Sequence, residues 1–277
     1  MYKKNSERGQ ILLIVVITMI VALTVGLTIA SRTVTELRLS RQNEESQRAF
    51  NAAEAGIDRV LQQGEGITLE EELGNNSTFV VSSDPFGGPQ LLMNNGEEVD
   101  QNVGADLWLS DYEPVMFENG FTGQLTIYWG DENQTSCSET NPVRPALEIV
   151  VLQGSVSNPD FNKYLYDTCS GRTAGTLDGA TNDIYTIPGL PGITLSNRIN
   201  TQIPITNGIL AKVIPLYNST TVAVVAQDLS DNAAALPSQG SVVESTGASG
   251  ETERKITFYQ SYPQMPIELF PYSIISQ

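Results

Sequence analysis

The sequence predicts an α+β protein in which one long N-terminal helix packs against a β-rich, mainly antiparallel globular head. Three observations predict this class. An uncharged run covers residues 11–30, and no Gly or Pro occurs from there to residue 55 except Gly26. All 14 prolines and most of the 23 glycines lie beyond residue 63. Such a distribution is typical of a helix followed by short strands and turns.

The uncharged run has the length of one membrane crossing. Its 20 residues, Ile11 to Ala30, span about 30 Å as a helix at 1.5 Å per residue. A signal peptide cut after Ala30 is one interpretation, but the run exceeds the usual ~7 to 15 apolar residues. A second interpretation is a plain anchor whose basic leader stays in the cytoplasm, although three arginines beyond residue 30 weaken that orientation signal.

The helical pattern continues past the membrane run. Residues 31–63 are rich in Ala, Glu, Arg, Gln and Leu, which favour helix. We expect an apolar stripe at helical spacing to lie on the folded head, formed by Phe50, Ala53, Ile57, Val60 and Leu61. Gly64 and Gly66 end the pattern. One helix over residues 10–63 would be roughly 80 Å long.

Gly9 ends a short charged leader and is separated from the apolar run only by Gln10. The leader and run, RGQILLIVVITMIVALTVGL, and the later segment AFNAAEAGIDRVL resemble the N-terminal region of type IV pilin-like proteins. The resemblance is to PilX-type minor pilins and, more loosely, to the K subunit of type II secretion pseudopili, and it covers about the first 63 residues. It implies that prepilin peptidase cuts between Gly9 and Gln10, sparing the apolar helix, and that the new N-terminus is methylated.

The resemblance also implies a division of the chain and a set of residues in the assembly helix. The division is a leader at 1–9, a transmembrane and assembly helix at 10–30, its amphipathic continuation at 31–63, and an extracellular head at 64–277. The assembly-helix residues are Ile14, Glu36, Phe50 and Glu54. Most of the family has glutamate at the fifth mature position, where this chain has Ile14. That difference indicates a minor, tip-proximal subunit; a diverged major pilin is the alternative.

The head is expected to be β-rich. The segment QLTIYWG alternates apolar and other side chains, as a half-buried strand does, whereas ALEIVVLQG is apolar enough for a central strand covered on both sides. About 210 residues can form one domain, and the alternative is two small domains split near residues 170–183. The predicted strands are STFVVSS, GQLTIYWG, ALEIVVLQGSV, ILAKVIPLYN, TTVAVVAQ and RKITFYQSYP.

The two cysteines, Cys137 and Cys169, both lie in polar, loop-like contexts. Outside the cytoplasm such a pair predicts a disulfide, which by the chain-entropy model stabilises the fold by roughly 3 to 4 kcal/mol. Two unrelated free thiols are the alternative. A zinc site fits poorly, because the chain has no histidine.

The absence of histidine also excludes triads and metal sites that depend on it. Carboxylate chemistry remains open for three pairs, and Asp, Asn and Gly in two loops could hold calcium, although turn formation explains these loops better. The weak calcium candidates are Asp131, Asp178 and Asp183. The carboxylate pairs are Asp131 with Glu132, Asp106 with Asp111, and Asp178 with Asp183. We expect no enzyme activity and no cofactor.

The last 23 residues, 255–277, contain five aromatic residues that could meet a partner or pack in the core. We expect a terminal strand followed by a Pro-rich tail on the head. The aromatic residues are Phe258, Tyr259, Tyr262, Phe270 and Tyr272.

The formal net charge of −17 disfavours nucleic acid, because phosphates would be repelled. The partners that the resemblance and the apolar run imply are other pilin subunits, prepilin peptidase and membrane lipid. The expected function is a minor pilin in the inner membrane that enters a type IV pilus or pseudopilus, with its extracytoplasmic head used for adhesion or another surface interaction. The alternative is a single-pass, membrane-anchored surface binding protein that does not polymerise.

Overall fold

The computed structural model describes residues 8–64, 66–112, 117–138, 143–155, 157–172 and 177–266. Among these it has one long helix, one short 3₁₀ helix and thirteen strands, which confirms the α+β class. The helices are α1 (Arg8–Leu61) and η1 (Met93–Gly96). The strands are β1 (Ile67–Leu73), β2 (Ser77–Pro85), β3 (Gln90–Leu92), β4 (Ala105–Trp108), β5 (Phe121–Trp129), β6 (Ala146–Ser155), β7 (Asn158–Tyr166), β8 (Ala180–Thr186), β9 (Thr194–Ile199), β10 (Ile203–Leu216), β11 (Val222–Gln227), β12 (Gly240–Ser249) and β13 (Thr252–Ser261).

The predicted helix is present almost in full, because α1 runs for 54 residues without a break. It ends two residues before the predicted limit, where the amides of Gln63 and Gly64 both donate to the carbonyl of Val60. Gly64 has φ +100°, a left-handed conformation that glycine adopts without steric cost and that commonly ends a helix.

The chain forms two compact units. Unit 1 comprises residues 1–82 and 244–257, and unit 2 comprises residues 83–243 and 258–277. This division does not coincide with a boundary at residue 64, because the first strands and a later hairpin belong with the helix. The alternative split near residues 170–183 falls inside unit 2. Strands β2, β12 and β13 each contribute residues to both units.

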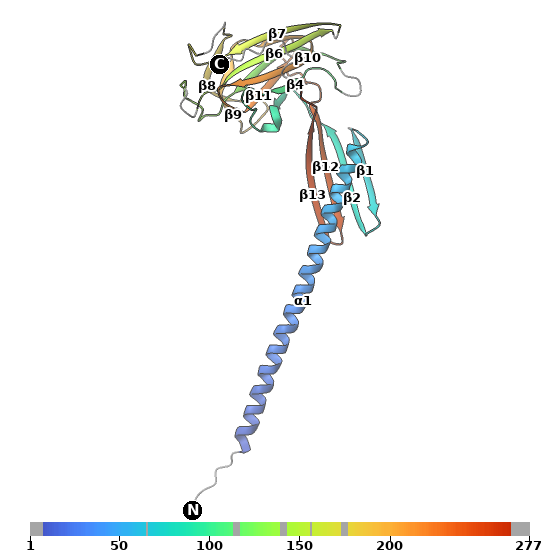
Figure 1. Cartoon of the computed structure of the whole chain (residues 1–277). Coiled ribbons are helices and arrows are strands. Elements are labelled where there is room, and N and C mark those ends of the chain that lie inside the picture. Colours follow the sequence, from blue (N-terminus) through green and yellow to red (C-terminus); the bar gives the residue numbers. More distant parts are fainter. Residues whose placement is uncertain are drawn as a thin grey trace, which may run out of the picture. The chain divides into compact units, whose positions relative to one another are not determined.

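Unit 1 is a helix packed on one face of a four-stranded sheet with the order β1-β2-β12-β13 (Figure 1). Phe79 and Val81 of β2 are buried, and so is every second residue in the unit 1 part of β12: Ser245, Gly247 and Ser249. Alternate residues point to opposite faces of a strand, so these side chains form one buried face. Most of them are small, which allows α1 to approach the sheet closely.

The helix uses a different stripe from the one predicted. Ala53 and Val60 are buried as expected, but Phe50 is 45% exposed and Leu61 is 40% exposed. The other residues of the buried stripe are Ala49, Ala52 and Gly56. A Cβ added to Gly247 would lie 2.0 Å from the carbonyl oxygen of Ala49. The prediction that Phe50 and Leu61 lie on the head is wrong, because α1 approaches the sheet closely through its alanine and glycine side, and Phe50 and Leu61 lie outside that side.

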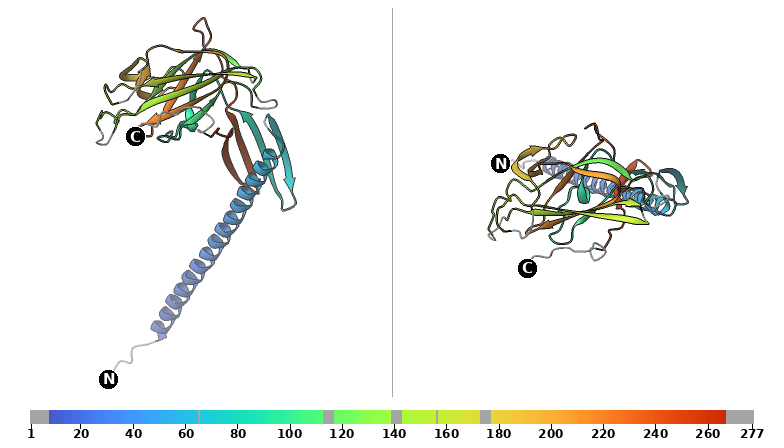
Figure 2. Two further views of the ribbon diagram at one scale, coloured as in Figure 1. Left: turned by 45° about the horizontal axis from the view of Figure 1, so that its top comes forward. Right: turned by 90° about the horizontal axis from the view of Figure 1, so that it is seen from above.

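Unit 2 is built on a nine-stranded sheet whose main path is β3-β11-β5-β10-β6-β7. Strand β4 joins the edge of β10, while β9 joins β5 and carries β8 (Figure 2 shows this unit from two directions). Every strand pair whose register is known in this sheet is antiparallel. The prediction of a mainly antiparallel head is therefore confirmed for this sheet.

Strand β10 connects two parts of the sheet. Its first residues pair with β5 as far as Gly208, and its later residues lie between β4 and β6. The register shifts between Ile205 and Gly208, where Asn207 has φ +50°. Irregularities of this kind bend a strand and let it pass from one layer to another.

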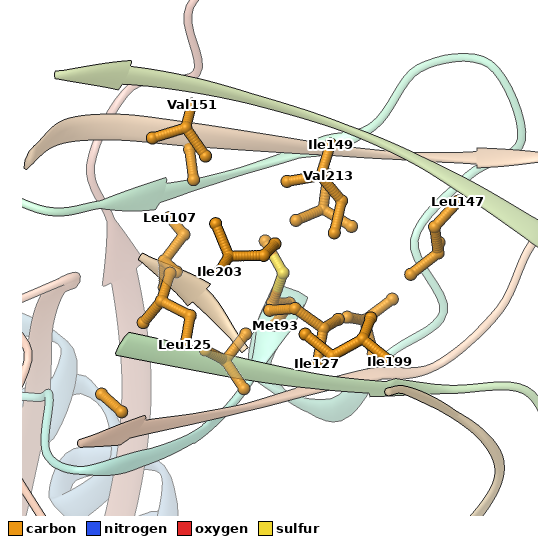
Figure 3. Close-up of a cluster of buried hydrophobic side chains, with 14 of the residues drawn as sticks. Met93, Leu107, Leu125, Ile127, Leu147, Ile149, Val151, Ile199, Ile203 and Val213 are labelled. Atoms are coloured by element: carbon orange, nitrogen blue, oxygen red, sulfur yellow. The ribbon is translucent and has the colours of Figure 1, made fainter. Parts of the chain in front are cut away.

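The core of unit 2 lies between these layers. In Figure 3, Ile149, Val151 and Val213 approach from one side, and Leu125 and Ile127 approach from the other. All five side chains are at most 1% exposed. The curved sheet thus encloses its own apolar core, to which the short helix η1 adds Met93 and α1 adds no residue.

Each of the six predicted strand segments contains a strand, and ALEIVVLQG is confirmed as a central strand because β6 lies between β10 and β7. The half-buried description of β5 is wrong. Leu125, Ile127 and Trp129 enter the main core, but Thr126 and Tyr128 on the other face are also buried. A second apolar cluster, which includes Ile187, Leu195 and Val225, covers Tyr128.

Candidate functional site

The first functional feature is the exposed apolar half of α1, residues 12–30. Every one of these side chains is exposed, including large ones such as Leu13, Ile17 and Leu27. The most apolar window of this helix has a mean hydropathy of 2.8 and contains no buried residue. Monomeric soluble proteins rarely expose so large an apolar surface. The helix is long and apolar enough to cross a membrane, so the described chain is compatible with a single-pass membrane protein.

The hydroxyl groups in this segment are satisfied within the helix. Thr18 donates to the carbonyl of Ile14, Thr24 to that of Val21, and Thr28 to that of Thr24. A hydroxyl without a partner is costly in hydrocarbon, because lipid offers no hydrogen bond. These internal bonds therefore let the three threonines face lipid.

The residues expected to act in processing and assembly all lie on α1. Gly9 and Gln10 are in its first turn, and residues 1–7 of the leader lie outside the described residues. Ile14, Glu36 and Glu54 are exposed. Together with the exposed Phe50, they are available to a neighbouring molecule and take no part in the packing of α1 on the sheet.

The second feature is the disulfide between Cys137 and Cys169, which confirms the predicted pairing. Their Cα atoms are 5.5 Å apart, and both residues lie in loops, as expected. Cys169 is 1% exposed, and its amide donates to the carboxylate of Asp167 at 2.8 Å. The bond joins the loop after β5 to the loop after β7.

Charged groups that no pattern in the sequence indicates lie beside this disulfide. Arg172 pairs with the buried carboxylate of Asp167, with Nε and Oδ2 2.9 Å apart. Its Nη2 also donates to the carbonyl of Arg144, and its guanidinium lies 4.2 Å from the centre of the Tyr217 ring. The disulfide is thus one part of a larger cross-link between loops.

The carboxylates that the sequence grouped in pairs have separate local partners. Asp131 accepts from the amide and side chain of Asn133, whereas Glu132 accepts from Thr194. Asp111 accepts from Asn119. The remaining acceptors are Asp178, bonded to the amide of Leu165, and Asp183, bonded to the amide of Ile184.

The arrangement of these carboxylates does not favour a binding site for calcium or another metal. Within the described residues, no group of three or more Asp, Glu or Cys side chains is placed to hold a metal ion. The Asp131 carboxylate closes a local turn with Asn133, as Asp side chains in turns commonly do. The calcium candidates Asp131, Asp178 and Asp183 thus gain no metal site from the fold.

Asp106 is the third feature, because it forms a buried ion pair with Lys212. Their side chains are 1% and 2% exposed, and the Nζ to Oδ1 distance is 2.7 Å. The two residues are direct cross-strand neighbours on β4 and β10. Nζ also donates to the carbonyl of Met265 at 2.8 Å, and the other Asp106 oxygen accepts from the Met265 amide. The pair therefore holds the segment that follows β13.

Burial raises the pKa of several tyrosines of unit 2. Burial is the main cause that raises the pKa of Tyr166 far above its ordinary value, with the nearby Asp178 and Tyr164 adding to it. Burial likewise raises the pKa of Tyr128, although Arg198 opposes the shift. Both phenols therefore remain protonated at neutral pH and supply packing surface.

The C-terminal aromatic residues behave in two ways. Phe258 and Tyr259 on the predicted terminal strand are 41% and 54% exposed. Tyr262 instead stacks on Tyr112, with ring centres 4.5 Å apart, and meets the edge of Trp108. Phe270 and Tyr272 lie outside the described residues.

No protein-family model matches the chain, and no curated protein or solved structure gives a match. Any assignment of function must therefore come from the residues and their arrangement.

Proposed function

We propose that this chain is a minor, tip-proximal pilin subunit that is cut by prepilin peptidase between Gly9 and Gln10. The apolar half of α1 then leaves the inner membrane and packs with other subunits in a type IV pilus or pseudopilus. The β-rich units stay on the extracytoplasmic side and serve adhesion or another surface interaction. The proposed role is structural and involves no catalysis.

One observation carries this proposal: α1 changes its environment without a break in the helix. Residues 12–44 are exposed, whereas every third or fourth residue from Ala49 to Val60 is buried against a sheet. A plain anchor needs only enough helix to cross the bilayer, about 20 residues. A continuous rod that has an exposed apolar segment at one end and a folded unit at the other is suited to packing against the rods of other subunits.

The exposed surface also gives a driving force for assembly. The large apolar residues from Leu12 to Ile29 are each 49% to 70% exposed. Outside lipid, burying apolar surface contributes about 25 cal/mol per Å². Helix packing against other subunits would therefore replace the lipid contacts that the segment loses on extraction.

The test is the N-terminus of the protein recovered from cells. We expect mass spectrometry to find Gln10 as the first residue, in both the membrane and the sheared surface fractions. Changing Gly9→Ala should cause the uncut form to accumulate. Gly26→Ala is a matched control, because it changes a glycine of the same helix that has open space around it.

Two outcomes would contradict the proposal. An intact leader in the mature protein favours a single-pass, membrane-anchored surface binding protein that does not polymerise. An N-terminus beyond Ala30 favours a cleaved signal peptide. Ile14→Glu tests separately whether the chain is a minor or a major pilin. The amount of chain assembled into the fibre should stay the same for a tip-proximal subunit and should rise for a diverged major pilin.

A further inference from the structure

Two adjoining cavities lie beside β4 in unit 2. The smaller holds about 80 Å³ and is lined by residues that include Asn95, Trp108 and Gln239. The larger holds about 120 Å³. Asn94, Ala105 and Gln264 line both. All these lining residues belong to unit 2. The shared lining makes the two cavities parts of one polar hollow.

A buried polar group without a partner lies in the wall of this hollow. Trp108 is 2% exposed, and its Nε1–H has no hydrogen-bond partner. Leaving such a donor unpaired is unfavourable. The ring itself is held by Tyr112, Phe117 and Tyr262, with ring centres 4.9 to 6.2 Å away. The indole N–H is shielded from solvent, and Trp108 contributes a fixed ring to the wall of the hollow.

Side-chain amides make up most of the remaining polar wall. Those of Asn95 and Gln264 are exposed and have no hydrogen-bond partner among the described residues. Asn94 and Asn95 both have left-handed backbone conformations, with φ +52° and +54°. Two consecutive left-handed non-glycine residues are unusual, and such conformations occur preferentially at binding sites.

Other groups beside the hollow are already engaged. The side-chain amide of Gln239 pairs with the free edge of β4. Its Oε1 accepts from the Trp108 amide, and its Nε2 donates to the Trp108 carbonyl. Asp106 is neutralised by Lys212. These contacts fix the shape of the wall and leave the Asn95 and Gln264 amides for a ligand.

The lining decides between classes of ligand. No Lys or Arg lines either cavity, and the chain carries a net charge of −17, so an anion is disfavoured. Asp106 is already paired, and the other lining carboxylate, Asp100, belongs to no group of three or more Asp, Glu or Cys side chains among the described residues that could hold a metal ion, which argues against a cation. An apolar molecule would leave the amides unpaired. A sugar suits this lining, since each hydroxyl can both donate and accept hydrogen bonds, as the amides do.

We propose that this hollow binds one ring of a neutral sugar, which hydrogen-bonds to the exposed amides of Asn95 and Gln264 beside the ring of Trp108. The inference rests on the surface-interaction part of the proposed function and does not require assembly. The site would give the head a ligand of defined chemistry: an uncharged carbohydrate on a neighbouring surface.

The experiment uses the full chain in phospholipid nanodiscs, because sugar-based detergents would compete for the site. The probes are D-glucose, D-galactose, D-mannose and N-acetyl-D-glucosamine, followed by saturation-transfer difference NMR and by tryptophan fluorescence. We expect saturable binding of at least one sugar. Asn95→Gly combined with Gln264→Ala should weaken it about tenfold or more, because two hydrogen bonds are lost.

A matched pair of changes controls for the fold. Asn76 is another exposed left-handed asparagine, with φ +60°, and Gln260 is another exposed glutamine, and neither lines the hollow. Asn76→Gly combined with Gln260→Ala should leave sugar binding unchanged.

Three results would overturn the inference: no sugar binds saturably, the double variant binds like the unchanged chain, or a blocked neutral tetrapeptide binds while the sugars do not. Because the nanodisc sample is unassembled, each of these results leaves the pilin proposal untouched. Conversely, a chain that binds sugar but keeps its leader would overturn only the pilin proposal.

Discussion

The two units of this protein achieve close packing in opposite ways. In unit 1 the side of α1 that meets the sheet consists mostly of small residues, with Phe79 of the sheet beside Gly56, and an added Cβ at Gly247 would lie 2.0 Å from the helix backbone. In unit 2 the core depends on large side chains such as Leu125, Ile149 and Trp129, together with a buried ion pair and a disulfide. Unit 1 should therefore be sensitive to added volume, and unit 2 to lost partners and lost volume.

The two units can be observed separately, which makes this comparison testable. Both tryptophans, Trp108 and Trp129, belong to unit 2, so intrinsic fluorescence reports on that unit. The only long helix of the described residues belongs to unit 1, so circular dichroism at about 222 nm reports mainly on α1.

The largest effect should come from Asp106→Ala in unit 2. This change leaves the ammonium group of Lys212 buried without its carboxylate partner, and breaking such a pair costs about 3 to 5 kcal/mol. Denaturant unfolding followed by tryptophan fluorescence measures the loss.

The control for this prediction replaces both charges, with Asp106→Leu and Lys212→Met. Replacing a buried pair with apolar residues of similar volume is often neutral in stability. A double variant as unstable as Asp106→Ala would show that the hydrogen bonds to the Met265 backbone, and not the charge balance, stabilise this part of unit 2.

The next effect should come from Gly247→Ala in unit 1. The added methyl group would meet backbone atoms of Ala49 and Ala53, at 2.0 and 2.5 Å, so the helix must move away from the sheet. We expect a loss of about 2 to 3 kcal/mol, the upper part of the usual range for overpacking. Thermal unfolding followed by circular dichroism measures it.

Gly74→Ala is the matched control in the same unit, because an added Cβ there has no neighbour within 4 Å. The two alanines add the same methyl group to the same unit. If both variants unfold at the same temperature, the close contact between helix and sheet is not what stabilises unit 1.

A smaller effect is expected from Phe50→Ala, although it removes the largest side chain in the second half of α1. Phe50 is 45% exposed, and changes away from buried contacts usually stay within about 0.5 kcal/mol. The same thermal measurement on the unassembled chain checks this value. A loss comparable to that of Gly247→Ala would mean that large side chains also stabilise unit 1, against the comparison above.

The smallest effect should be the acid sensitivity of one surface loop in unit 2. Hydrogen bonds from the Asn232 side chain, the Asn232 amide and the Ser230 amide lower the pKa of Asp228. Its folded pKa is below the unfolded value of about 3.9, so the stabilisation is present above pH ~4 and is lost as pH falls through the folded pKa.

NMR of the Ser230 and Asn232 amides across this acid range measures the transition. Asp228→Asn should abolish it, because the amide does not titrate. A transition at the ordinary pKa of aspartate would show that these hydrogen bonds do not persist in solution.

The features that the sequence predicted well are local ones. The helix, six of the strands and the Cys137–Cys169 bond depend on composition, period and the presence of two cysteines. Strand β4 was missed because its four residues, ADLW, are too short to show a clear alternation. The polar hollow was missed because its walls come from residues 86 to 264, which no local pattern connects.

By itself, the sequence determined where the helix runs, that part of it can cross a membrane, and which segments become strands, because each property follows from neighbouring residues. Only the tertiary structure decided that α1 packs through alanine and glycine, that both faces of β5 are covered, and that Lys212 meets Asp106 across two strands. The physical reason is that burial and charge pairing depend on residues distant in the chain, and a residue's own type does not reveal which partners the fold will bring to it.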